Sequence, residues 1–356
     1  METVWKTLAA AAVLACLAGS EAFGQRPSTA GHVAELAAYL DRVEIAEPIS
    51  YGRLAVYPVL VPQEARLRGH WLTLDEALSR GTLLVREKGS GNVPTVIVEN
   101  RSRDDYVFLM AGEIISGGMQ TRTVRRDVVL APRQRVDLDV FCVEHHRWEG
   151  AAHFSAGKAL VPQSIQKEMR KGADQSRVWS EVARNNAALR AENRTGSLET
   201  ALKDAKVADR LGDVRRHVLP EVPQGATGFI FVADGRALGA EFFGREELAR
   251  QLLPKLLDAY AVDFVLIDKE GTGAAGHGDN ETAIVLFKRV CQAGSQRNDT
   301  PGSGAGIRTH ADRLVGDGVS LDGTLVHYGA QVEDRLIPEP VHPGPRPHTI
   351  WPQSNQ

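Results

Sequence analysis

Alternating apolar and polar positions predict a series of strands in the first 150 residues. Side chains alternate between the two faces of a strand, so a period of two with many β-branched residues indicates sheet. The predicted strands are Ile49–Val61, Leu83–Glu87, Thr95–Asn100, Val107–Met110, Thr121–Leu130 and Val136–Glu144. Ala131–Gln134 separates the last two and predicts a hairpin loop.

Apolar residues at helical spacing predict the helices. Thr73–Leu78 indicates a short helix with a Thr73/Glu76 capping box. Residues 162–212 change to a helical period, with a further helix starting at Ser197. Arg245–Tyr260 carries a leucine on each turn of its inward face and predicts a long helix.

The last third of the chain mixes strands, helices and loops. Asp234-Gly235 predicts a hairpin turn between strands Gly228–Ala233 and Ala237–Phe243. The composition of Gly271–Gly278 and Ala293–Gly306 predicts flexible loops. Thr282–Cys291 fits either helix or strand. Later strands are expected at Ile307–Leu314 and Leu325–Tyr328.

These elements predict an α+β fold: mixed, mainly antiparallel sheets, with helices from a central insertion and after a late hairpin. We expect one domain over residues 45–330, a leader over 25–44 and a Pro-rich, disordered tail over 331–356. The chain has 356 residues, of which 43% are hydrophobic and 24% charged, which is ordinary for a globular protein. A net charge of −3 gives no sign of nucleic-acid binding.

Residues 1–24 have the composition of a signal peptide. Lys6 precedes a short apolar run, and Ala22-Phe23-Gly24 offers small residues for cleavage. We therefore expect a secreted or periplasmic protein with no integral membrane segment after cleavage. The alternatives are lipidation at Cys16 and an uncleaved anchor. Cys142 and Cys291 would remain, either as a disulfide or as separate buried thiols.

Polar residues at the ends of two predicted strands mark a candidate site. Val136, Leu138, Val140 and Cys142 share one face, and Glu144 continues it. Pairing that face with the face of Thr121–Leu130 puts Arg122 opposite Glu144 or opposite Cys142. Either register gathers an arginine, an amide and a carboxylate at one sheet rim, a plausible place for a polar or anionic ligand. The residues expected at this rim are Glu113, Gln120, Arg122, Cys142, Glu144, Arg147 and Trp148.

Simpler interpretations of these residues stay open. Arg122 and Glu144 could form a structural ion pair with Cys142 as a core residue. His145 and His146 should point to opposite faces of a strand, which argues against a metal site with Glu144 and His153. Cys142 ends an apolar stripe, so a nucleophilic role is disfavoured. We predict no metal and no cofactor.

The order of several short segments resembles the ARG and Rhodanese-Phosphatase-superfamily-associated Protein domain. Phe141-Cys-Val-Glu144-x-x-Arg147-Trp148 is the most specific of them. The others are Leu72–Leu78, Ala111–Glu113, Gln120-x-Arg122, Gln175-x-x-x-Trp179 and Ala233–Ala240. The resemblance implies one α+β domain over about residues 45–330, but no reaction. Its name records association with ADP-ribosylglycohydrolase-like and rhodanese-phosphatase-like proteins, which hints at nucleotide or phospho-ester ligands.

Three functional hypotheses follow. The first is a protein that binds a small polar or anionic ligand at the rim, with Gln120, Arg122, Arg147 and Trp148 as contacts. The second is a hydrolase of glycosidic or phospho-ester bonds, with Glu113 and Glu144 as acid and base, whose pKa values must then differ. The third is a structural envelope protein. The sequence names no protein partner.

Overall fold

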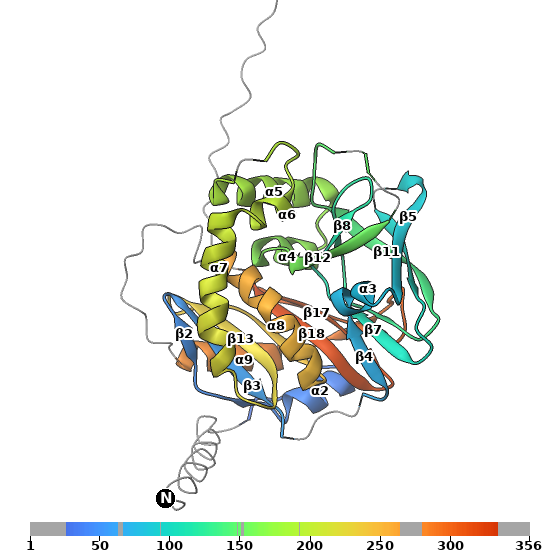
Figure 1. Cartoon of the computed structure of the whole chain (residues 1–356). Helices are drawn as coiled ribbons and strands as arrows, with labels where there is room; N and C mark the ends of the chain where they lie inside the picture. The colour runs from blue at the N-terminus through green and yellow to red at the C-terminus, as the bar shows by residue number, and fades with distance from the viewer. Residues whose placement is uncertain are drawn as a thin grey trace, which may run out of the picture.

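A nine-stranded sheet forms the larger part of the fold (Figure 1). The computed structural model describes residues 26–62, 67–92, 94–147, 149–150, 153–191, 193–263 and 280–333. In order across the sheet, the strands are β1 (Glu44–Ile45), β3 (Leu54–Leu60), β13 (Ala226–Ala233), β14 (Arg236–Phe243), β18 (Thr324–Val332), β17 (Leu314–Leu321), β16 (Ala305–Ala311) and β15 (Gln296–Asn298). β2 (Ile49–Tyr51) pairs with β3.

Helices cover both faces of this sheet. Phe229 and Phe231 of β13 point to a core shared with α7 (Ala205–Val218) and α8 (Glu246–Ala261). Ile230 and Val232 point to a second core with α2 (Ala34–Leu40) and α9 (Asn280–Gln292). Every residue of β13 is buried for this reason, and from Gly228 onward its sequence is apolar on both faces rather than alternating.

Two smaller sheets stand beside the large one and share one core. The first has the order β10 (Val128–Leu130), β7 (Asp105–Leu109), β4 (His70–Thr73). The second has the order β12 (Phe154–Leu160), β8 (Glu113–Gly117), β9 (Arg122–Val124), β11 (Arg135–Cys142), β6 (Thr95–Asn100), β5 (Leu83–Asn92). Among the described strands, β4 and β7 pair in parallel and the other ladders are antiparallel. The predicted α+β class is confirmed.

The helices of the central insertion, α3 (Leu74–Ser79) and α8 lie where the sequence predicts them. α3 begins after Thr73, whose backbone N–H donates to the Glu76 carboxylate at 3.0 Å. The central insertion forms α4 (Gln163–Arg170), α5 (Gln175–Leu189), α6 (Leu198–Leu202) and α7, followed by the 3-10 turn η2 (Leu219–Glu221). The hairpin of β13 and β14 leads into α8, as expected. No helix in the described part of the chain is long and apolar enough to cross a membrane.

The predicted strand Thr121–Leu130 is wrong as a single element. β9 pairs with β11, but β10 pairs with β7 in the other small sheet. The chain changes sheets at Asp127, whose carboxylate turns inward to accept from the Ala111 backbone N–H at 2.8 Å. Residues 131–134 do form a turn, but the strands on its two sides belong to different sheets.

Other boundaries also differ from the prediction. Ile49–Val61 is a hairpin rather than one strand, because Gly52 turns the chain with φ +58°. The predicted loop Ala293–Gly306 contains β15, and the ambiguous Thr282–Cys291 lies within α9. Ile307–Leu314 divides between β16 and β17. The predicted tail begins too early, because β18 continues through Gln331 and Val332. The predicted signal peptide, the rest of the tail from residue 334 and the Gly271–Gly278 loop lie outside the described residues.

A buried group of charged side chains joins the small sheets to the large one. His327 of β18 lies between Asp127, 2.6 Å from Nδ1, and Glu241 of β14, 3.1 Å from Nε2. Arg170 of α4 pairs with the same Glu241 at 3.4 Å and with Asp317 of β17 at 2.6 Å. Burial would lower the pKa of His327, but the two carboxylates outweigh it and raise it to about 9. The imidazolium is therefore the favoured form at neutral pH.

Candidate ligand-binding pocket

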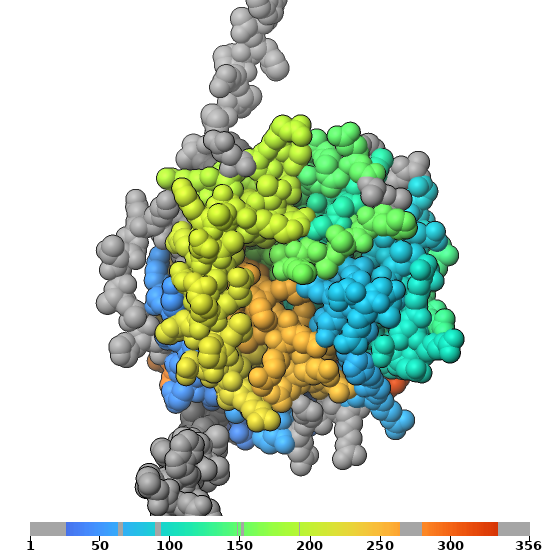
Figure 2. All heavy atoms as spheres, viewed as in Figure 1, coloured from blue at the N-terminus to red at the C-terminus, as the bar shows by residue number. Residues whose placement is uncertain are grey.

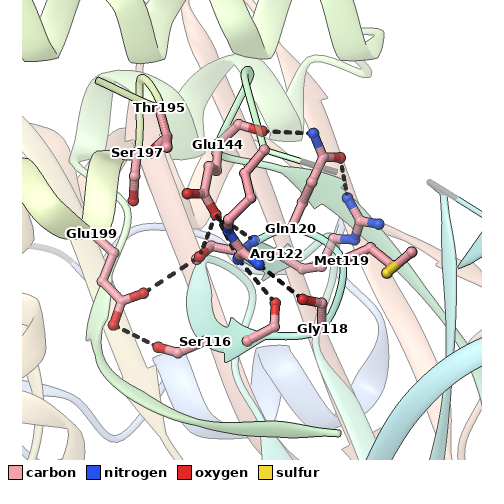
Figure 3. Close-up of polar contacts among 12 residues, drawn as sticks. Ser116, Gly118, Met119, Gln120, Arg122, Glu144, Thr195, Ser197 and Glu199 are labelled. Carbon is pink, nitrogen blue, oxygen red and sulfur yellow. Dashed lines mark hydrogen bonds and ion pairs between the residues drawn. The ribbon is translucent and has the colours of Figure 1, made fainter. Parts of the chain in front are cut away.

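The structure brings together five of the seven predicted rim residues, which are Gln120, Arg122, Cys142, Glu144 and Arg147. Figure 3 shows the first, second and fourth of them. β9 and β11 pair so that Arg122 lies opposite Cys142, one of the two registers expected. Gln120 donates through Nε2 to the Glu144 backbone carbonyl at 2.9 Å, and its Oε1 accepts from Arg122 Nη1 at 2.8 Å. Arg122 also lies 3.7 Å from the Glu87 carboxylate. The side chains of Gln120, Arg122 and Glu87 are buried.

One oxygen of the Glu144 carboxylate accepts four hydrogen bonds, two from Thr121 and two from Arg147. The Thr121 backbone N–H and hydroxyl each donate to Oε2 at 3.0 Å. Arg147 donates to the same oxygen from Nε at 2.9 Å and from Nη2 at 2.7 Å. Burial acts to raise the pKa of Glu144, but the hydrogen bonds from Arg147 and Thr121 outweigh it, so the pKa is lowered. This carboxylate is an ionised structural acceptor.

The Arg147 guanidinium is occupied by groups of the protein itself. Besides Glu144, it donates to the backbone carbonyls of Gly117 at 3.2 Å, Gly118 at 2.9 Å and Glu149 at 2.6 Å. Both glycines have positive φ, +103° for Gly117 at the end of β8 and +55° for Gly118 in the turn that begins there. Arg147 therefore fixes this turn, and its donors are not directed at a ligand. Trp148, its predicted companion, lies outside the described residues.

Glu113 is not part of the rim. It begins β8, two residues before Ile115, which pairs with Arg122, but its carboxylate turns to a different set of partners. Its carboxylate pairs with Lys255 of α8 and accepts from the Met110 backbone N–H at 2.8 Å. Burial is the main influence on the pKa of Glu113 and raises it. The pKa values of Glu113 and Glu144 thus move in opposite directions, but the two carboxylates belong to separate clusters.

Glu199 is a rim residue that the sequence analysis missed. It lies on α6, where the sequence shows only an ordinary surface glutamate, yet its side chain is 11% exposed. Its carboxylate accepts from the Ser116 hydroxyl at 2.5 Å and lies 3.5 Å from the Thr121 hydroxyl. The Thr121 hydroxyl thus contacts the carboxylates of both Glu144 and Glu199, and Figure 3 shows Glu199 beside Ser116. Glu199 also pairs with Lys203.

Glu199 belongs to the wall of a pocket between β12, α6, α7 and α8. The pocket has a volume of about 130 Å³, and Figure 2 shows the surface hollowed where these segments meet. Its apolar wall includes Leu160, Leu202, Leu211 and Val262. Its charged residues are Lys158, Glu199, Lys203, Arg215 and Asp258. An apolar interior with a few charged groups at its edge is typical of a small-molecule site.

Asp258 is the titratable group of the pocket with a strongly shifted pKa. Burial raises the pKa to about 6, and the ion pair with Arg215 opposes this only in part. The side chain retains 18% exposure. A carboxyl group that titrates near neutral pH in a pocket is a frequent feature of binding and catalytic sites.

The described histidines and cysteines near the rim differ from the sequence expectation in one respect. His145 and His146 were expected on opposite faces of a strand, but β11 ends at Cys142 and their rings meet, with Nδ1 atoms 3.2 Å apart. No group of three metal-ligating side chains occurs within the described residues. Cys142 and Cys291 are both free and buried, which settles the disulfide question. Burial raises the pKa of the Cys142 thiol, which makes it a poor nucleophile.

The fold and the pocket define an α+β protein with a small pocket that has an apolar interior and charged side chains at its edge. The family model of the ARG and Rhodanese-Phosphatase-superfamily-associated Protein domain matches residues 42–330. The chain belongs to this family, as the resemblance of the short segments predicts. No curated protein and no solved structure matches the chain.

Proposed function

We propose that this protein is exported and binds a small polar or anionic molecule in the pocket between β12, α6, α7 and α8. The observation that carries the proposal is Glu199, which connects the pocket wall to the predicted Gln120–Glu144 cluster through Ser116 and Thr121. The cluster then supports the pocket rather than contacting the ligand. This differs from the ligand contacts expected from the sequence.

The size of the pocket limits the ligand. Sites for drug-sized ligands have volumes of roughly 300–1,000 Å³, and this pocket has about 130 Å³. A complete nucleotide such as ADP-ribose is therefore too large to be enclosed. A fragment of the size of one ring or one sugar fits better.

A pocket-filling variant tests the proposal. Ala208 lines the pocket from α7, and Ala208→Phe would occupy its interior without removing a charge. Calorimetric titration with phosphate, ribose 5-phosphate and small carboxylates should give binding that Ala208→Phe abolishes. Ala183→Phe, on the exposed side of α5, is the control and should bind normally. Absence of binding to every probe would favour the structural envelope role.

A hydrolase is the second candidate, and it rests on two carboxyl groups in the same pocket. Asp258, with a pKa raised to about 6, would act as the acid, and Glu199 would supply the carboxylate. Glu113 and Glu144 do not take these roles in this proposal. Release of nitrophenol from nitrophenyl phosphate and nitrophenyl glycosides should be lost in Asp258→Asn. Ligand binding without any turnover would contradict the hydrolase and support a protein that only binds its ligand.

Export has its own support and its own test. The short apolar run and the Ala22-Phe23-Gly24 segment support cleavage before Gln25. Mass spectrometry of the exported protein should find Gln25 at the N-terminus. A diacylglycerol group on Cys16 would show lipid anchoring instead.

A further inference from the structure

The charges around the pocket do not cancel. Lys203 pairs with Glu199, and Arg215 pairs with Asp258, so these four residues form two ion pairs. Lys158 of β12 lines the same pocket, is exposed, and forms no ion pair within the described part of the chain. The pocket therefore carries one positive charge in excess, provided that Asp258 is ionised.

The backbone of Lys158 is held in an unfavourable conformation. Its φ is +56°, in the left-handed region that non-glycine residues rarely adopt. It lies in a bulge where the pairing of β12 with β8 shifts between Ala156 and Leu160. Bulges occur at functional sites because they redirect a side chain. Strained residues cluster at such sites for a related reason.

The apolar interior of the pocket indicates the size of the apolar group that a ligand would carry. An engineered apolar cavity of about 150 Å³ binds benzene, and the present pocket, about 130 Å³ in volume, has a wall containing three leucines and a valine. A group of about the size of a benzene ring fits this interior. One excess positive charge at the edge matches a single anionic group.

We propose that the pocket binds small amphiphilic monoanions, a ring-sized apolar group bearing a carboxylate, and that Lys158 binds the carboxylate. This rests on the proposed ligand-binding function and specifies its ligand class. Lys158 is a binding residue in this proposal, retained at a position where glycine would be more favourable for the backbone.

Calorimetric titration of the purified protein with phenylacetate, phenylacetamide and acetate tests the ligand class. Phenylacetate should bind at least tenfold more tightly than the neutral amide or acetate, because only phenylacetate has both the ring and the charge. Equal binding of phenylacetate and phenylacetamide would overturn the role of the charge. Binding of phosphate or ribose 5-phosphate that Ala208→Phe abolishes, without binding of phenylacetate, would overturn the ligand class and leave the pocket function standing. Failure of every probe would overturn both.

Variants of Lys158 separate binding from folding. Lys158→Gly should raise the melting temperature by relieving the positive φ, and should weaken phenylacetate binding tenfold or more. Lys158→Gln should weaken binding similarly, and Lys158→Arg should retain it. Arg133→Gly is the matched control, since Arg133 is exposed, has φ +64° and does not line the pocket. It should raise the melting temperature without changing binding. Unchanged phenylacetate binding in Lys158→Gly would show that Lys158 does not contact the ligand.

Discussion

The guanidinium of Arg147 donates two hydrogen bonds to one oxygen of Glu144, from Nε at 2.9 Å and from Nη2 at 2.7 Å. The Glu144 side chain is 6% exposed and the Arg147 side chain 23%. We predict that Arg147→Ala lowers the free energy of unfolding by about 1–3 kcal/mol, because it leaves a nearly buried carboxylate without its cation. Urea denaturation measures this loss.

A double-mutant cycle with Glu144→Gln isolates the pair. The amide removes the stranded charge, so the double variant should lose less stability than the sum of the two single variants. A coupling energy near zero would show that Arg147 acts only through the carbonyls of Gly117 and Gly118.

Alkaline pH should weaken the junction between the sheets at His327. The pKa of this imidazole is raised to about 9 by Asp127 and Glu241 despite its burial. A raised pKa gives stability that is complete below the unfolded pKa of about 6.5 and is lost as the pH rises through 9. The free energy of unfolding should therefore fall between pH 6.5 and pH 9, by at most about 3 kcal/mol. Urea denaturation at a series of pH values measures the decline.

Arg170 stays charged and Tyr260 stays neutral during that titration, because the pKa values of both groups are raised. Arg170, Asp317 and Tyr260 face the same Glu241 or its neighbours. His327→Gln keeps a polar group of similar reach but cannot titrate. Its stability should be lower at pH 7 and nearly constant up to pH 9. A variant curve parallel to that of the unaltered protein would assign the decline to another group.

Lys255 and Glu113 form a buried ion pair that a single substitution should damage severely. The Lys255 side chain is 9% exposed and that of Glu113 is fully buried. Lys255→Met should cost about 3–5 kcal/mol, because it leaves the Glu113 carboxylate with Met110 as its principal donor. The double variant Lys255→Met with Glu113→Leu should recover most of this loss in chemical denaturation. No recovery would mean that Asp75, 3.0 Å from Lys255, dominates the cluster.

Neither cysteine should react with alkylating reagents in the folded protein. Burial raises the pKa of the Cys142 thiol, and it raises that of Cys291 to about 12. Because the thiolate is the reactive form, labelling by iodoacetamide at pH 8 should be slow for both. Unfolding in urea should make both react at once. Rapid labelling of folded Cys142 would restore it as a candidate nucleophile.

Local patterns predicted much of the fold correctly. The capping box at Thr73, the Asp234-Gly235 hairpin and the long helix before Tyr260 each depend on residues close in sequence. The division of Thr121–Leu130 does not, because Asp127 is drawn inward by Ala111 and by His327, a residue 200 positions away. The periodicity of apolar residues in a local segment cannot predict a contact between residues so far apart in the sequence.

The same distinction applies to the site. The alternation of side chains along the two strands predicted that Gln120, Arg122 and Glu144 lie at one rim, because pairing the apolar faces limits the register. It did not predict that the Arg147 guanidinium donates its hydrogen bonds to the backbone carbonyls of Gly117 and Gly118. Glu199 and Asp258 reach the pocket from helices far along the chain, and nothing in their local sequence indicates burial. The positive φ of Lys158 likewise arises from the pairing of β12 with β8.

Ligand affinity should depend on the protonation of Asp258. Burial raises the pKa of this carboxyl group to about 6, so it is largely neutral at pH 5 and ionised at pH 8. At pH 5 the pocket has lost one negative charge, and an anion should bind more tightly there than at pH 8. Benzenesulfonate is a suitable probe because it stays ionised over this range. We expect its affinity to fall threefold to tenfold between pH 5 and pH 8, measured by calorimetry. Asp258→Asn should bind with nearly constant affinity, whereas Asp213→Asn, an exposed change on α7 outside the pocket, should keep the pH dependence. A pH dependence that survives in Asp258→Asn would assign it to a different group and remove Asp258 from the site.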